Sequence, residues 1–110
     1  MLADRAAREI RKALKKLPDV PDGCVFRVTT SQKTTVYVSI EGVCGDWVWE
    51  YVEDHLQMTV QAQALEAAVW DIVRSFRTEL AVIEGIHIYS YNAQVFYDYK
   101  ILKPELIPTS

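Results

Sequence analysis

The 110-residue sequence has little of several residue types that mark whole classes of protein. It contains two cysteines, four glycines and four prolines, too few for a disulfide-rich scaffold, a collagen-like repeat or a low-complexity chain. No apolar run reaches the roughly 18 residues that a membrane-spanning helix needs, and Asp4 and Arg5 stand where a signal peptide carries its apolar stretch. We therefore expect a single domain, residues 1–110, in the cytoplasm and without a membrane partner.

The two cysteines, Cys24 and Cys44, are expected to be reduced and partly buried, because nothing in the sequence indicates secretion. Together with His55 and His87 they supply the ligand types of a zinc site. They lack the close pairs, roughly two to four residues apart, that structural zinc sites normally use. The sequence therefore predicts no metal and no other cofactor.

Positive charge is absent from residues 41–71, which hold seven acids and no lysine or arginine. Residues 1–16 hold six bases and two acids, and the remaining residues cancel. The formal net charge of −3 thus conceals a block of +4 and a block of −7. We expect a small electric dipole, with a basic helix at one end and an acidic surface in the middle of the chain.

Hydrophobic spacing predicts most elements of the first half of the chain. Apolar residues at helical spacing up to Leu17 predict an amphipathic N-terminal helix of about four turns, ended by Pro18 and Pro21. Residues 24–30 and 34–40 are rich in β-branched and aromatic side chains and predict a hairpin with one covered and one wetter face.

The middle of the chain is ambiguous, because residues 47–57 fit both a strand and a helix. Their charges follow helical spacing and Asp46 is a plausible N-cap, so the helix is favoured. A further helix is predicted from Leu65 to Phe76, with Thr59 as a cap ahead of it.

The C-terminal part predicts a second hairpin, formed by residues 86–91 and 94–102, and a loose tail at 104–110. The order of elements predicts an α+β fold. It has about four antiparallel strands in two hairpins, with two to three helices packed on one face.

No catalytic motif supports a specific reaction. The sequence has no Gly-rich phosphate loop, no nucleophile in an elbow context and no metal-spaced cluster. His55 and His87 are the residues that an enzyme would have to use, and both are expected to be ordinary surface or cross-strand histidines. We therefore expect a protein without catalytic activity.

Two binding surfaces are predicted on different residues. The first, called here the acidic–aromatic patch, suits a protein partner with a basic surface and comprises Trp47, Trp49, Glu50, Glu53 and Asp54. The alternative is a nucleic-acid interface on the basic helix, comprising Arg8, Arg11, Lys12 and Lys15, with Tyr89, Tyr91, Tyr97 and Tyr99 as a stacking platform. A sequence pI of 5.3 favours the protein partner.

The N-terminal half carries one family resemblance. Residues 7–16, a proline-containing connection, and the segments 25–28 and 36–42 resemble the helix-plus-hairpin start of a small domain found in large polyvalent proteins of phages and conjugative elements. The resemblance implies a mobile-element context. In that context a short acidic protein is similar in type to phage-encoded inhibitors of bacterial defence systems, the anti-CRISPR type included, which act by binding and blocking. Tyrosine-rich edge strands also make the sequence compatible with a homodimer.

Overall fold

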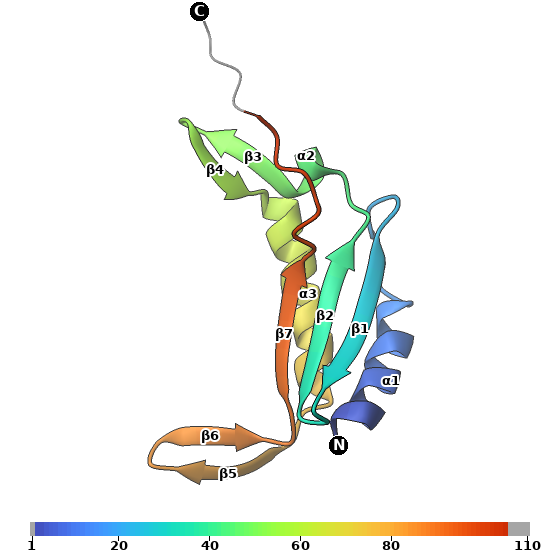
Figure 1. Cartoon of the computed structure of the whole chain (residues 1–110), viewed down its shortest axis with the longest axis vertical. Helices are drawn as coiled ribbons and strands as arrows, with labels where there is room; N and C mark the ends of the chain where they lie inside the picture. Colours follow the sequence, from blue (N-terminus) through green and yellow to red (C-terminus); the bar gives the residue numbers. More distant parts are fainter. Residues whose placement is uncertain (1, 106–110) are drawn as a thin grey trace, which may run out of the picture.

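The computed structural model describes residues 2–105, and within them the backbone forms three helices and seven strands (Figure 1). The α+β class predicted from the sequence is confirmed, with seven strands in place of about four. The helices are α1 (Ala3–Leu14), α2 (Gly45–Val48) and α3 (Val60–Ser75). The strands are β1 (Val25–Ser31), β2 (Thr35–Glu41), β3 (Trp49–Val52), β4 (His55–Met58), β5 (Glu79–Ile83), β6 (Ile86–Tyr89) and β7 (Asn92–Tyr97).

The central sheet has three strands in the order β1-β2-β7. The β1–β2 hairpin predicted from the sequence is confirmed, and its register sets Val28 opposite Val38. Strand β7 runs parallel to β2, with Val95 beside Val38. A parallel neighbour requires a crossover connection, and α3 lies in that connection.

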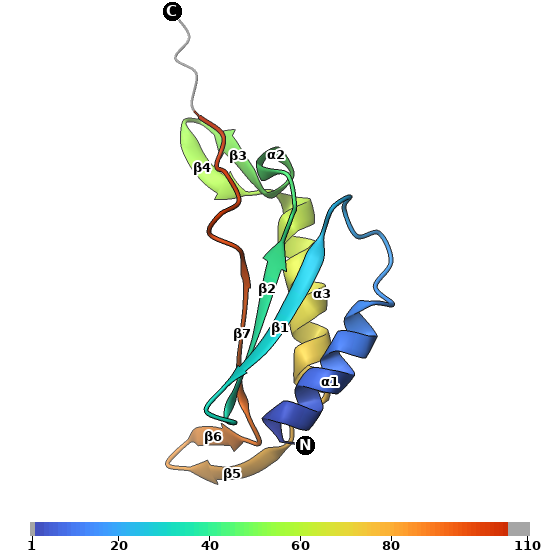
Figure 2. The ribbon, with the colours of Figure 1, turned by 45° about the vertical axis from the view of Figure 1, so that its right-hand side comes forward.

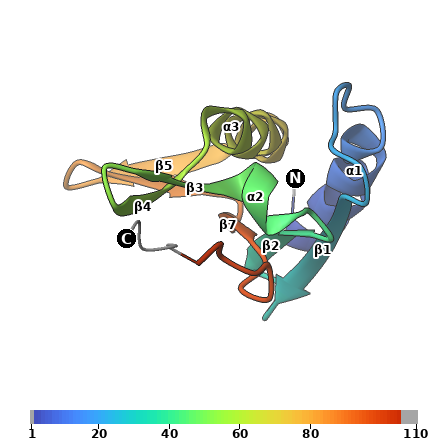
Figure 3. The ribbon, with the colours of Figure 1, turned by 90° about the horizontal axis from the view of Figure 1, so that it is seen from above.

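Helices α1 and α3 pack on the same face of this sheet (Figure 3). Val36, Val38 and Ile40 alternate along β2 and are fully buried against the helices. The helices supply Ala6, Ile10 and Leu14 from α1 and Leu65, Val69 and Val73 from α3. The opposite face carries polar and aromatic side chains, including the ion pair between Arg27 and Glu41, 3.1 Å apart. The covered and wetter faces predicted from the alternation are therefore both present.

The predicted hairpin between residues 86–91 and 94–102 is wrong. Strand β6 pairs with β5, and β7 joins β2 instead. The parallel pairing places Ala93, Val95 and Tyr97 on the covered face of the sheet, where Val95 is buried. Burying these side chains against the core stabilises the pairing of β7 with β2 more than a local hairpin with β6 would. Pro104 and Glu105 lie outside any helix or strand, and residues 106–110 of the predicted loose tail lie outside the described residues.

The helix favoured for residues 47–57 is also wrong. A single turn, α2, follows Cys44, so Asp46 is not an N-cap. Strands β3 and β4 then form a hairpin whose register pairs Trp49 with Met58 and Tyr51 with Leu56. This strand pattern puts four large apolar side chains on one face, and their packing overrides the helical spacing of the charges.

Helix α3 agrees with the prediction, including its cap. The Thr59 hydroxyl accepts a hydrogen bond from the Ala62 amide at 3.2 Å and donates one to the Trp47 carbonyl at 2.6 Å. Two tyrosines, one in β7 and one directly before it, form hydrogen bonds with the backbone of α3. Tyr91 donates to the Val73 carbonyl, and Tyr97 donates to the Ala62 carbonyl at 2.7 Å.

Two hairpins project from this body, β3–β4 beyond the N-terminal end of α3 and β5–β6 beyond its C-terminal end (Figures 1 and 2). They give the molecule an elongated shape of 57 × 34 × 23 Å. A glycine fixes the base of the β3–β4 hairpin, since a Cβ added at Gly45 would overlap the Leu102 carbonyl oxygen. The fold therefore offers two extended arms on a small core.

Replacing Thr59 by alanine tests the link between α2 and α3. The variant loses both the N-cap bond and the bond to Trp47, so the free energy of unfolding falls by about 1–2 kcal/mol. Urea unfolding followed by circular dichroism measures it. Thr59→Ser keeps the hydroxyl and stays within about 0.5 kcal/mol of the wild type; an equal loss in both variants would contradict the hydroxyl's role.

Alkaline pH tests the burial of Tyr97. Burial raises the pKa of Tyr97, and the nearby Glu66 and Cys24 act in the same direction. The folded protein thus holds a proton that the unfolded chain releases above about pH 10. Stability is retained below the unfolded pKa and declines as pH rises above it. In Tyr97→Phe the urea midpoint falls less steeply between about pH 9.5 and 11.5, whereas Tyr99→Phe, at an 87% exposed position, keeps the wild-type slope; identical slopes in all three proteins would refute the assignment.

Candidate functional site

The β3–β4 hairpin carries four residues of the acidic–aromatic patch, and α2 carries the fifth, Trp47. A two-residue turn joins Val52 to its partner His55. Glu53 and Asp54 form this turn with positive φ angles of 51° and 64°, and both are exposed. The two acids therefore stand at the tip of a projecting arm.

Trp47 is half-buried and anchored through its backbone. Its carbonyl accepts the Thr59 hydroxyl and also the Gln61 side-chain amide at 3.2 Å. Its side chain borders two shallow hollows of about 420 and 270 Å³ beside the α1–β1 connection. Trp47 is thus a support for the arm with part of its ring accessible from that side.

Trp49 faces the core side of the hairpin, opposite Met58, and both pack against the hydrophobic core. The Lys103 ammonium lies 5.0 Å from the centre of its ring, a distance at which a cation–π attraction operates. Lys103 thereby brings a base into the acidic region. Sequence reasoning missed this contact, since no local pattern connects Lys103 with Trp49.

Glu50 is paired with Gln57 and lies on the hairpin face opposite to Trp49. Glu50 is half-buried, whereas Glu53 and Asp54 are exposed. The structure thus divides the predicted patch. Its acids lie on the outer face and tip of the arm, and its tryptophans form the arm's packed base.

The basic face of α1 is partly used within the fold. Arg11 donates a hydrogen bond to the Val28 carbonyl at 2.7 Å, and Lys12 lies 3.5 Å from Glu9. Arg8 and Lys15 are exposed. Of the four bases predicted for the nucleic-acid interface, Arg8 and Lys15 therefore form no such contact within residues 2–105.

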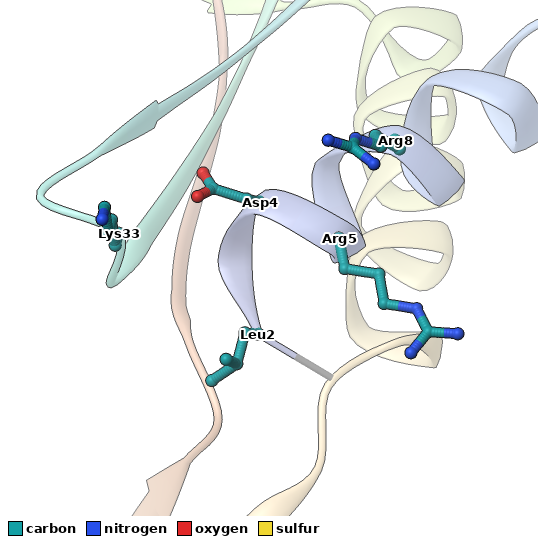
Figure 4. A pocket seen from close by; sticks show the side chains of 5 residues that line it. All are labelled: Leu2, Asp4, Arg5, Arg8 and Lys33. Carbon is teal, nitrogen blue, oxygen red and sulfur yellow. The ribbon is translucent and has the colours of Figure 1, made fainter.

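A hollow of about 340 Å³ lies between the start of α1 and the β1–β2 turn. Leu2, Asp4, Arg5, Arg8 and Lys33 line it (Figure 4). In the close view Arg8 and Lys33 approach it from two elements, whereas the Arg5 guanidinium points away from Lys33. Asp4 accepts a hydrogen bond from the Thr30 hydroxyl at 3.2 Å. The nucleic-acid interface predicted from the sequence did not include Lys33, because Lys33 lies outside the basic helix.

The four tyrosines do not form the predicted stacking platform. Tyr91 is buried, and Tyr97 is bonded to α3. The Arg77 guanidinium covers the Tyr89 ring at 3.8 Å. Tyr99 is the one member of the set that is widely exposed, at 87%. These tyrosines mainly stabilise the fold.

The two histidines lie in different hairpins. His55 is exposed at the start of β4, and His87 lies in β6, 3.2 Å from Glu79.

Burial raises the pKa of the Cys24 thiol, which lowers its thiolate fraction and its nucleophilicity. Within residues 2–105 no cluster of three or more histidine, cysteine, aspartate or glutamate side chains is arranged to hold a metal ion.

No helix in this described part of the chain combines the length and apolar character needed to span a bilayer. Comparison with protein-family models, curated proteins and solved structures finds no match to this chain. The resemblance to the mobile-element domain therefore stays a prediction from the sequence, and function has to be argued from the geometry.

Proposed function

We propose that the chain is a non-catalytic binding module that docks on a basic surface of another protein. The acidic part of the acidic–aromatic patch makes the contact: Glu50 on the outer face of the β3–β4 hairpin, with Glu53 and Asp54 at its tip. In keeping with the sequence-based expectation, the proposal places this activity in the cytoplasm.

One observation carries the proposal. The three carboxylates lie within five residues of one another. Within residues 2–105, none of them takes part in an ion pair. Unpaired charges on a projecting arm attract an opposite surface over about 8 Å at physiological salt. The arm's charge is thus available to a partner and is not used by the fold.

The base of the arm supports a preformed contact. Thr59 and Gln61 fix the Trp47 carbonyl, and Lys103 covers the Trp49 ring. An arm held at its base loses less conformational freedom on binding, which favours affinity. The tryptophans therefore serve as support for the acids more than as the contact itself.

The partner's chemistry follows from the acidic tip. A groove that binds nucleic acid carries the dense positive charge that three neighbouring carboxylates complement. The sequence resemblance is in keeping with this proposal, because it implies an inhibitor that acts by binding and blocking. We therefore propose an inhibitor of a nucleic-acid-binding defence protein.

A turn exchange tests the proposal without weakening the fold. Replacing Glu53 by asparagine and Asp54 by glycine removes two charges, and Asn-Gly is the residue pair that a positive-φ turn prefers. With each protein immobilised as bait in bacterial lysate, the exchange reduces capture of basic proteins at least tenfold, measured by quantitative mass spectrometry.

The control is Glu84→Asn, which removes the one acid in the corresponding positive-φ turn of the other arm, beside Gly85. It retains the captured proteins. Equal capture by the wild type and the Asn-Gly variant would show that the tip does not bind them.

The second candidate function is nucleic-acid binding through Arg8, Lys33 and Lys15. The hollow lined by Arg8 and Lys33, with Asp4 between them (Figure 4), favours it, since bases from two elements border the same hollow. Single-stranded DNA on a column would then retain the protein at low salt. In Arg8→Gln/Lys33→Gln the slope of log affinity against log salt concentration becomes shallower by about 1.4, as expected for the loss of two phosphate contacts to a single strand.

The control for this test is Arg74→Gln/Lys100→Gln, which changes the net charge equally at two exposed positions elsewhere. It elutes close to the wild type. Absence of retention at low salt, or equal elution of both double variants, would exclude this site as a nucleic-acid interface.

A further inference from the structure

The β5–β6 hairpin, called here the apolar arm (residues 79–89), is the most exposed hydrophobic segment of the fold. All five residues of β5 are exposed. Five large aliphatic side chains on the arm keep between 39% and 67% of their surface accessible, namely Leu80, Val82, Ile83, Ile86 and Ile88. Exposed aliphatic side chains in such density mark an interaction surface.

The register of the arm separates it into two unlike faces. The pairs Ala81–Ile88 and Ile83–Ile86 share one face, which is wholly apolar. The other face holds Val82 and His87, and His87 stacks on Tyr89 and lies 3.2 Å from Glu79. The polar face is therefore satisfied within the chain, and the apolar face is left without cover.

An isolated two-stranded hairpin is marginally stable in water. At the root of the apolar arm the Ser90 amide donates to the Thr78 carbonyl at 2.7 Å, and Arg77, which follows α3, covers the Tyr89 ring. Its aliphatic side chains contribute little to the folded monomer while they face water. Cover for the apolar face would stabilise both the arm and whatever covers it.

Strand β7 follows the arm directly and presents a second uncovered feature. It forms one edge of the central sheet, and its sequence from Asn92 to Tyr97 contains no charge and no proline. Charges and proline are the usual means by which edge strands avoid pairing with another chain. The outer edge of β7 is thus an unprotected template for a further strand.

We propose that a second copy of this chain covers both features, as a two-fold dimer in which β7 pairs antiparallel with its counterpart. The apolar face carries no charge by which a charged partner would be recognised. A second copy supplies an identical uncharged edge for β7 and, beyond that edge, the exposed Tyr99 and Leu102 for the apolar face. The central sheets would then join into one six-stranded sheet. This interface lies apart from the acidic tip and is independent of the function proposed above.

The size of the arm decides against a dimer held by the arms alone. Five residues at about 3.3 Å each give an apolar face of roughly 17 × 10 Å, well below the ~800 Å² per partner of a stable interface. Including the β7 edge adds backbone hydrogen bonds along six residues. The antiparallel arrangement also sets each arm beside the far end of the partner's β7, after which Tyr99 and Leu102 are 87% and 83% exposed.

Two matched double variants of the full chain test this interface. Ile83→Lys/Ile86→Lys places two charges on the apolar face, and Val82→Lys/His87→Lys places two on the polar face. Each pair is directly cross-strand, so both variants place two like charges opposite each other in the hairpin, and the polar-face variant in addition loses the His87 contacts with Glu79 and Tyr89. Analytical ultracentrifugation up to about 100 μM should show a dimer for the wild type and the polar-face variant, and at least tenfold weaker dimerisation for the apolar-face variant.

Hydrogen exchange reports on the β7 edge in the same proteins. The β7 amides outside the β2 ladder exchange slowly in the dimer and at least tenfold faster in the apolar-face variant. A wild type that stays monomeric, equal dimerisation of both variants, or unchanged β7 exchange on dissociation would each overturn the proposed interface. Circular dichroism confirms that both variants remain folded.

Discussion

The parallel pairing of β7 with β2 is the constraint on which the rest of the structure depends. Val95 lies beside Val38, and α3 crosses over the sheet between the two strands. Tyr91 and Tyr97 then fix β7 to the α3 backbone. With β7 held beside β2 and fixed to α3, its other edge stays open, and β6 pairs with β5. The apolar arm and the open edge of β7 both follow from that one pairing.

Local sequence patterns predict the parts of the fold that local interactions determine. The amphipathic period of α1, the β1–β2 hairpin and the Thr59 cap of α3 are all properties of neighbouring residues. The parallel strand pair joins residues far apart in the chain, and no local pattern encodes it. The helix prediction for residues 47–57 was wrong for another reason. Their charges fit a helix, and the strand became favourable only through packing of Trp49 and Met58 against the distant core.

The candidate site shows the same division. The exposed acids Glu53 and Asp54 could be selected from charge alone, because solvated charge is a local property. The position of Lys103 over Trp49 could not be predicted, nor could the hollow that Lys33 and Arg8 both line, since each joins separate elements. Helix α3 also separates two kinds of surface by about 24 Å, several times the screening length in physiological salt. Binding at the acidic tip therefore depends on charge, whereas binding at the apolar arm depends on burial of aliphatic surface.

Nuclear Overhauser contacts between backbone protons test the central pairing most directly. The account predicts contacts between β2 and β7 in parallel register around Val38 and Val95, together with antiparallel contacts between Val82 and His87. These should be present in the apolar-face variant as well, where they arise within one chain. Antiparallel contacts between residues 86–91 and 94–102, with none between β2 and β7, would contradict the account and remove both the arm and the open edge.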